Sequence, residues 1–204
     1  MFRKFSLFFV SIITLSGCSS SEEKAVIAAD SFDRSILLEN IADNIIIPAY
    51  EDFSIKMSAL KTSGETFTTK TTQTNLTALR ASWFAAYKTW QHIEMFNIGK
   101  AEQIQFSFYM NIYPLTVKDV EDNISNGNYD LNSLNNQDAQ GFPALDYLLY
   151  GVADTDATIL EKYSTGANKE NYKKYITAVL NQMNTLTIQV VLDFKAKRNT
   201  FVSN

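Results

Sequence analysis

The segment from Asn75 to Asn97 carries large side chains at intervals of three or four residues, a spacing that only a helix places on one face. The set reads Leu76, Arg80, Trp83, Tyr87, Trp90 and Glu94. A helical face with two tryptophans and a tyrosine is expected to lie in the core. The sequence therefore predicts a helix with Arg80 near one end of its buried face and Glu94 at the other. These two side chains either lie at the rim of the core and reach water, or they serve a function.

The rest of the chain shows similar helical spacing and no strand-like alternation. Helices are expected over about residues 31–48, 49–60, 101–115, 116–124, 142–150 and 168–198. Pro48 must kink or interrupt the first of these because it lacks an N–H. The threonine-rich residues 61–75 and the asparagine-rich residues 125–141 are predicted to be loops. The fold class is therefore all-α, an antiparallel bundle of several helices.

The first eighteen residues, MFRKFSLFFVSIITLSGC, have the layout of a bacterial secretion signal, with two basic residues, an apolar run and then small residues. The apolar run is too short to be a comfortable membrane span. Its end, Leu-Ser-Gly-Cys, resembles a lipobox, in which cleavage before the cysteine leaves a lipidated first residue. We expect a lipoprotein signal peptide at residues 1–17 and a lipid anchor at Cys18. The alternative is an ordinary signal peptide followed by an incidental cysteine.

Residues 18–30 are expected to form a lipidated, flexible tether, and residues 31–204 the folded domain. The predicted location is the bacterial cell envelope, with the membrane as a partner through the lipid. Ser19, rather than an aspartate, follows Cys18. In lipoproteins this favours the outer membrane, at its periplasmic face or at the cell surface.

Charge and cysteine content exclude two further classes of protein. The chain has 18 basic and 22 acidic residues and a formal net charge of −4, so it offers no basic field for a nucleic acid. Cys18 is the only cysteine, which excludes a fold held together by internal disulfides.

The stretch GFPALDYLLYG, residues 141–151, places one acid among aromatic and leucine side chains. Pro143 suits the first turn of a helix, and Asp146 then lies within or just beyond that turn, close to the positive end of the helix dipole. A helix that is apolar nearly all round is expected to be buried. A buried carboxylate needs a cation, a metal, hydrogen-bond donors or a proton.

Three segments in this order and spacing behind a lipobox, ENIADNIIIPAYEDF, NLTALRASWFAAYKTWQHIEMFNIGKAE and GFPALDYLLYG, resemble the imelysin family of bacterial surface and periplasmic proteins. That family includes iron-regulated proteins and was named for an insulin-cleaving metallopeptidase. The resemblance implies an all-helical fold. Family members have two related bundles and are usually longer, and this chain matches the first bundle.

The hallmark of the family is G-x-H-x-x-E, whose histidine and glutamate are the proposed metal-binding or catalytic pair. In this sequence Gly141 matches, Pro143 stands in place of the histidine, and Asp146 replaces the glutamate. The only histidine is His92, which lies two residues from Glu94 and so points to a different side of a helix. No zinc site can be assembled from these residues, and the sequence argues against an enzyme.

A carboxylate pair remains, because Glu94 also matches a glutamate of the family. If their helices pack together, Glu94 and Asp146, with Tyr150 nearby, could form an oxygen-rich site for iron or calcium. The alternative is an ion pair between Asp146 and Arg80 that holds the helices together.

Three functions stay open at this point. The first is a non-catalytic binding lipoprotein that acts in the uptake of iron or another metal. The second is an imelysin-type metallopeptidase that needs residues outside this chain. The third is a structural or interaction module that contacts an envelope protein.

Overall fold

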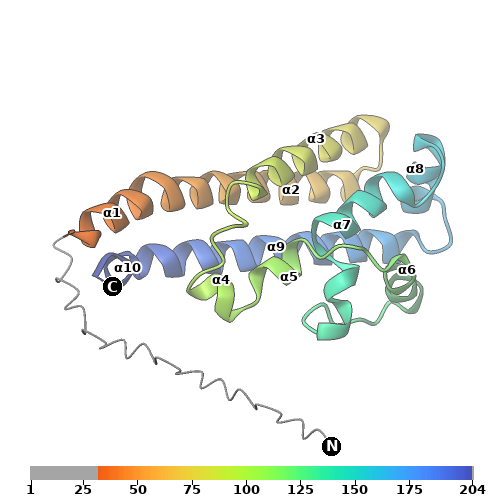
Figure 1. Ribbon diagram of the computed structural model, residues 1–204. Helices are drawn as coiled ribbons and strands as arrows, with labels where there is room; N and C mark the ends of the chain where they lie inside the picture. Colours follow the sequence, from red (N-terminus) through yellow and green to blue (C-terminus); the bar gives the residue numbers. More distant parts are fainter. Residues whose placement is uncertain (1–31, 204) are drawn as a thin grey trace, which may run out of the picture. The chain divides into compact units, whose positions relative to one another are not determined.

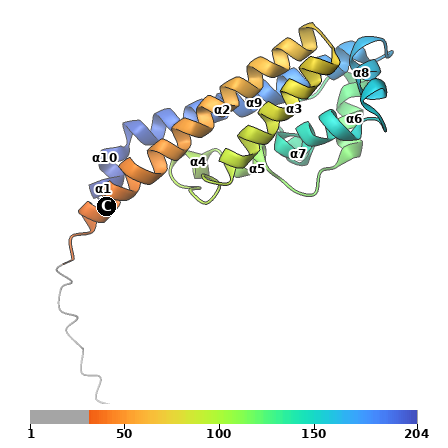
Figure 2. The same ribbon diagram turned by 90° about the horizontal axis from the view of Figure 1, so that it is seen from above.

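Three long helices form the frame of the protein in a computed structural model that describes residues 32–203. They are α2 (Ile47–Thr69), α3 (Gln73–Trp90) and α9 (Lys169–Ala196). Figures 1 and 2 show them running along one another, with α3 and α9 each beside α2. No residue from 32 to 203 is in a strand, which confirms the predicted all-α class.

The two outer pairings of α2 are antiparallel. A three-residue turn returns the chain from α2 into α3. Across the other interface, Glu51 pairs with Lys195 at 2.6 Å, and Ser58 donates a hydrogen bond to Asn184 at 3.3 Å. From Glu51 to Ser58 the residue numbers rise along α2, whereas those of the α9 residues that they contact fall from Lys195 to Asn184. Helix α9 therefore runs antiparallel to α2.

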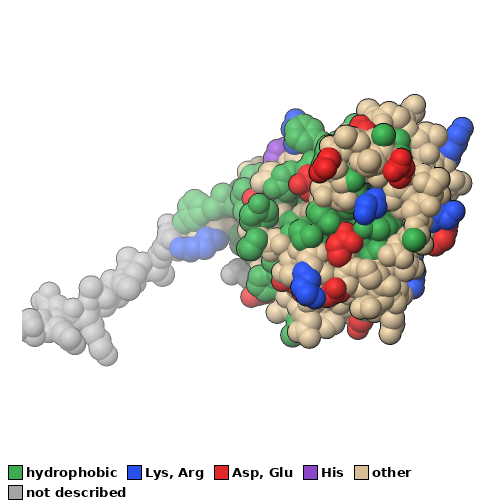
Figure 3. Space-filling model, turned by 90° about the vertical axis from the view of Figure 1, so that its right-hand side faces the viewer, with side chains coloured by type: hydrophobic (Ala, Val, Ile, Leu, Met, Phe, Trp, Pro, Cys, Tyr) green, Lys and Arg blue, Asp and Glu red, His purple; other side chains and the backbone are tan. Residues whose placement is uncertain are grey.

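Shorter helices pack against α3 and α9. They are α4 (Lys100–Gln103), α5 (Phe106–Met110), α6 (Val117–Asn126), the 3-10 helix η2 (Leu134–Ala139), α7 (Gly141–Asp146), the π-helical turn η3 (Tyr147–Gly151) and α8 (Asp156–Ser164). The helix expected over 101–115 is thus divided into α4 and α5, at Gln105, whose φ is +54°. The loop expected over 125–141 contains η2. Figure 3 views the end of the molecule with α6 and α8, where acidic and basic side chains are interspersed.

Pro48 interrupts the regular helical hydrogen bonding without ending the helix. Helix α1 (Arg34–Ile41) leads into a π-helical turn, η1 (Ala42–Ile46), and Pro48 follows as the second residue of α2. The π turn already departs from the regular α-helical hydrogen bonds. The missing N–H of Pro48 therefore comes at a point where the regular pattern of bonds is already interrupted. Figure 2 shows the ribbon of α1 running on into α2.

The prediction that residues 61–75 form a loop is wrong, because α2 continues through Thr69. Thr66 donates its hydroxyl to the Thr62 carbonyl at 2.9 Å, a bond that a helical threonine can make without leaving the helix. Phe67 is fully buried and packs edge-on against Tyr163 at 5.0 Å between ring centres. Burial of this aromatic side chain outweighs the weak helix propensity of threonine.

The core lies between the three long helices and the short ones. Phe53, Met57 and Leu60 of α2 are fully buried, and their spacing of four and three residues places them on one face of the helix. Trp90 contacts three phenylalanine rings at centroid distances of 5.6–6.2 Å, and these rings come from three different segments: Phe53, Phe106 and Phe142. The C-terminal end is joined to the N-terminal helices by Arg198 of α10 (Arg198–Ser203), which pairs with Glu39 and Asp43.

The predicted signal peptide, Cys18 and the whole of the predicted tether lie outside the described residues. From Asp33 onward the chain forms one compact unit. Among the helices described, none has the length and apolar character that crossing a membrane would need.

Candidate binding site

Glu94 does not lie on the aromatic face of α3, because the helix ends before it. Helix α3 stops at Trp90, and a turn follows in which the N–H of Ile93 donates to the Trp90 carbonyl at 2.9 Å. Ile93 is buried in this turn, whereas Glu94 and His92 are exposed. The predicted position of Glu94 at one end of the buried face is therefore wrong.

Gly141 allows α7 to begin directly against the end of α5. Its φ is +75°, and a Cβ atom there would lie 2.3 Å from the Met110 carbonyl oxygen, so no other residue fits without displacing the backbone. One residue later, the Phe142 carbonyl accepts a hydrogen bond from the indole N–H of Trp83 at 3.2 Å. The first turn of α7 is thus held on one side by α5 and on the other by α3.

Asp146 is the last residue of α7 and lies at the surface, so the predicted burial of this carboxylate is wrong. Its neighbours Leu145 and Leu148 take the buried side of the helix. Within residues 32–203, the Asp146 carboxylate has no hydrogen bond and no ion pair. The surrounding side chains remove enough water to raise the pKa of Asp146 above its ordinary value.

Arg80 pairs with a different acid from the one considered in the sequence. Its Nη2 lies 2.8 Å from a carboxylate oxygen of Asp156, the first residue of α8. Nε and Nη2 also donate to the Leu149 carbonyl of η3 at 3.1 and 2.7 Å, and the guanidinium lies 4.4 Å from the centre of the Tyr150 ring. The alternative of an Arg80–Asp146 ion pair is therefore wrong, and Arg80 instead fixes α3 to η3 and α8.

A pocket of about 160 Å³ opens beside Asp146. It is lined by Trp83, Tyr87, Asn111, Tyr113, Phe142, Pro143 and Asp146. Trp83 and Tyr87 are stacked, with ring centres 5.5 Å apart and planes only 7° from parallel. Tyr87 in turn meets the Phe142 ring at 5.2 Å. Four aromatic residues and one carboxylate thus define the chemistry of this pocket.

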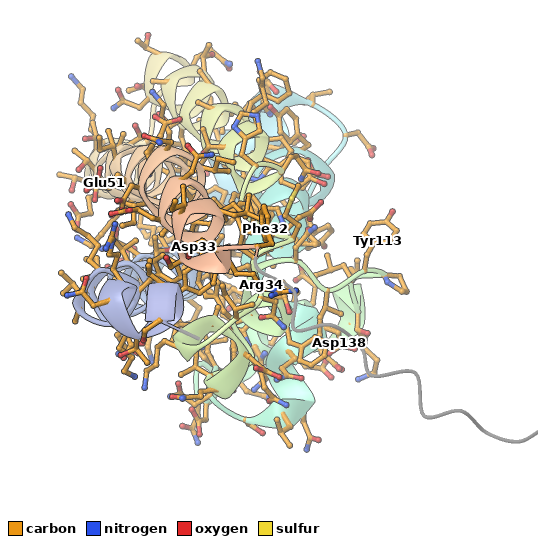
Figure 4. All side chains as sticks on the ribbon, turned by 60° about the vertical axis from the view of Figure 1, so that its left-hand side comes forward. Phe32, Asp33, Arg34, Glu51, Tyr113 and Asp138 are labelled. Atoms are coloured by element: carbon orange, nitrogen blue, oxygen red, sulfur yellow. The ribbon has the colours of Figure 1, made fainter. Side chains whose placement is uncertain are left out.

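Tyr113 forms the outer rim of the pocket. Its side chain is 85% exposed, and Figure 4 shows it extending outward from the segment between α5 and α6. The sequence singled out neither Tyr113 nor Asn111, because they lie in an irregular segment where no periodicity shows which way a side chain points. Tyr87 was visible as part of the aromatic face of α3.

The two predicted metal ligands, Glu94 and Asp146, do not line the same pocket. Residues 32–203 contain no cluster of three or more histidine, cysteine, aspartate or glutamate side chains able to hold a metal ion. Among the described residues, Asp146 is the only carboxylate that lines the pocket, and Glu94 does not line it. Tyr150 is outside the pocket as well; its ring packs edge-on against Trp83 and under Arg80. Calcium takes 6–8 oxygen ligands, so these donors do not fit a calcium ion.

The fold and the site together define a class, an all-helical bundle protein with an aromatic pocket where α7 begins. The chain belongs to the imelysin family, whose model, Imelysin, matches residues 46–202. No curated protein matches it.

Two solved structures share the fold. One is an imelysin-like protein from Psychrobacter arcticum, with 23% identity and a TM-score of 0.66 over 83% of this chain and 52% of the other. The second is described as an iron-regulated protein A precursor from Parabacteroides distasonis, with 20% identity and a TM-score of 0.64 over 78% of this chain and 44% of that one. The chain thus spans about half the length of these relatives.

Proposed function

We propose that this protein is a lipid-anchored, non-catalytic binding protein of the bacterial cell envelope, and that a small ligand binds in the pocket beside Asp146. The observation that carries this proposal is the pocket itself. A cavity of about 160 Å³ with aromatic walls and one unpaired carboxylate lies at the position of the family motif. Concave sites with apolar walls and a few polar groups are the usual form of small-molecule sites.

The side chains of the pocket support binding rather than turnover. Pro143 occupies the place of the histidine in the family motif and offers neither a metal ligand nor a group that transfers protons. Within residues 32–203, Asp146 is the only carboxylate in the pocket lining, and general acid–base catalysis usually needs a second positioned group. The lipobox-like sequence at Cys18 supports the anchor.

A role in the uptake of iron or another metal is part of the proposal, supported by the iron-regulated protein among the structural relatives. The donors of the pocket fit a small organic molecule better than a bare ion. We therefore propose that iron is linked to this protein in one of two ways. Either the protein acts when iron is scarce, or its ligand is an organic molecule and not a bare metal ion.

The experiment that tests pocket binding uses the two tryptophans as reporters. Trp83 lines the pocket, whereas Trp90 is 2% exposed in the core, so the two indole N–H signals in a ¹⁵N-resolved NMR spectrum serve as probe and internal reference. The chain from residue 18 onward, with Cys18→Ser to prevent lipidation, retains the whole compact unit. Cationic, anionic and neutral small molecules are added in turn.

We expect at least one class of small molecule to shift the Trp83 indole N–H signal in a saturable way, while the chemical shift of the Trp90 signal stays unchanged. If no class moves the Trp83 signal, the pocket is not a binding site and the proposed function fails.

A further inference from the structure

We propose that the ligand of this pocket is an organic cation with a substituted ammonium group, which packs on the aromatic rings and places its charge beside Asp146. This inference rests on the proposed function and names its ligand class. It depends on three features of the pocket, namely the walls, the charge and the scarcity of hydrogen-bonding groups.

The walls present aromatic rings from three separate segments. Trp83 and Tyr87 come from α3, Phe142 from α7, and Tyr113 from the irregular segment before α6. The faces of aromatic rings carry negative electrostatic potential, so a cation is attracted to them and an anion is repelled. Sets of aromatic side chains around a cavity are a recurrent way to recognise alkylated ammonium groups.

The charge of the pocket is negative and uncompensated. Asp146 has no ion pair within the part of the chain described, and the nearby aromatic rings cannot neutralise it. Arg80 lies on the same face of α3 as Trp83, and its guanidinium is occupied by Asp156 and the Leu149 carbonyl. A partly desolvated carboxylate beside aromatic rings lacks a positive partner, and the ligand can supply it.

The pocket holds few hydrogen-bonding groups, which distinguishes between kinds of cation. Apart from Asp146, the polar side-chain groups are the amide of Asn111, the hydroxyls of Tyr87 and the exposed Tyr113, and the Trp83 indole N–H, which already donates to the Phe142 carbonyl. A primary ammonium has three N–H donors and a guanidinium has five, and each unsatisfied donor costs free energy on burial. A methylated ammonium carries its charge on apolar methyl groups that contact the rings directly.

The probe that tests this inference is choline, compared with its uncharged isostere in which a carbon atom replaces the quaternary nitrogen. Both are titrated against the unlipidated chain described above, with Trp83 as the reporter. Because the two molecules have the same shape, a difference in affinity measures the charge. We expect choline to bind about ten-fold more tightly than the isostere. Equal affinities, or tighter binding of the isostere, overturn the proposal.

Two variants at the surface test the predicted contacts without disturbing the core. Asp146→Asn removes the charge and Tyr113→Ala removes the rim, and each is expected to weaken choline binding by about ten-fold. The matched controls are Glu94→Gln, an exposed acid outside the pocket, and Phe84→Ala, an exposed aromatic residue on α3 that is also outside it. Both controls should bind as the wild type does. If Asp146→Asn binds choline unchanged, the inference fails.

Butylammonium, guanidinium, calcium and acetate complete the series and separate the two proposals. Tighter binding of any of these than of choline overturns the substituted-ammonium inference but leaves a binding protein in place, provided that the Trp83 signal moves. If no compound in the series moves the Trp83 signal, both proposals fail.

Discussion

The guanidinium of Arg80 donates two hydrogen bonds to the Leu149 carbonyl, the acceptor that links α3 to the π-helical turn after α7. This contact spans 69 residues of sequence, and the same guanidinium lies over the ring of Tyr150, which packs edge-on against the pocket residue Trp83. Arg80 therefore holds helices together, as the ion-pair alternative expected, but its partners are the Leu149 carbonyl and Asp156 instead of Asp146.

Removal of the Arg80 guanidinium is expected to destabilise the fold. Arg80→Met keeps the apolar stem of the side chain but leaves the Leu149 carbonyl without its donor, at an expected cost of about 1–3 kcal/mol in the free energy of unfolding. The measurement is urea denaturation at neutral pH. Asp156→Asn serves as the control, because it removes only the more exposed partner and should cost less. Equal losses in the two variants would show that the Leu149 contact contributes little.

Gly141→Ala is expected to be strongly destabilising. The added Cβ meets the Met110 carbonyl oxygen at 2.3 Å, and the φ of +75° disfavours any side chain, so the loss should exceed about 1 kcal/mol. Gly99→Ala is the matched control, since Gly99 also has a positive φ, +58°, but has open space around it. Thermal denaturation of both variants separates steric overlap from backbone strain. A loss of the same size at both positions would mean that the close approach to Met110 is relaxed at no cost.

Asp146→Asn is expected to leave stability unchanged at pH 3 and to raise it slightly at pH 7. The pKa of Asp146 is raised by desolvation, so the folded chain holds this proton more tightly than the unfolded chain. The Asp146 carboxyl group therefore contributes stability that is fully present below the pKa it has in the unfolded chain. This contribution is lost as the pH rises through the higher pKa that it has in the folded chain. At pH 7 the neutral amide removes the cost of the ionised form, a gain of about 0.5 kcal/mol or less at a surface site. Urea denaturation at the two pH values measures the difference.

Asp156→Asn should behave in the opposite way. Hydrogen bonds from Arg80, and then from Gln73, lower the pKa of Asp156. Its contribution to stability is therefore present above the unfolded pKa and lost as the pH falls through the folded value. The variant should be less stable than the wild type at pH 7 and should approach the stability of the wild type in acid.

The Asp146→Asn variant has its own contradicting outcome. If it is less stable than the wild type at pH 7, the Asp146 carboxylate has a favourable partner.

Cys18→Ser is expected to abolish lipid attachment. Wild-type cells grown with labelled palmitate should yield a labelled protein that sediments with membranes, and the variant should yield an unlabelled one. Ser19→Ala is the control and should remain labelled. Label in the Cys18→Ser protein would refute an anchor at this residue.

The sequence predicted those parts of the fold that depend on helical periodicity. Leu76 and Trp90 are buried on α3, and Phe53, Met57 and Leu60 on α2, because their spacing alone places them on one face. The threonine-rich end of α2 was missed, since local propensity favours a loop there and only the distant contact between Phe67 and Tyr163 reverses it.

The candidate site was harder to predict, because it depends on where helices end. Glu94 has the correct spacing for the aromatic face, but α3 stops four residues earlier and Ile93 takes the buried position. Asp146 was expected to be buried from its apolar neighbours, yet it occupies the one side of α7 that faces the pocket. Tyr113 and Asn111 lie in irregular backbone, so only the tertiary fold identifies them as pocket residues.

The hydrogen bond from the Trp83 indole to the Phe142 carbonyl joins residues that are 59 positions apart, and this has a thermodynamic consequence. The walls of the pocket meet only after α3, α5 and α7 have docked, so the unfolded chain offers its ligand no comparable site. Any molecule that binds there must therefore also raise the melting temperature, by an amount that grows with the logarithm of its concentration once the site is saturated. Ligand binding in this pocket is thus thermodynamically linked to folding of the whole bundle.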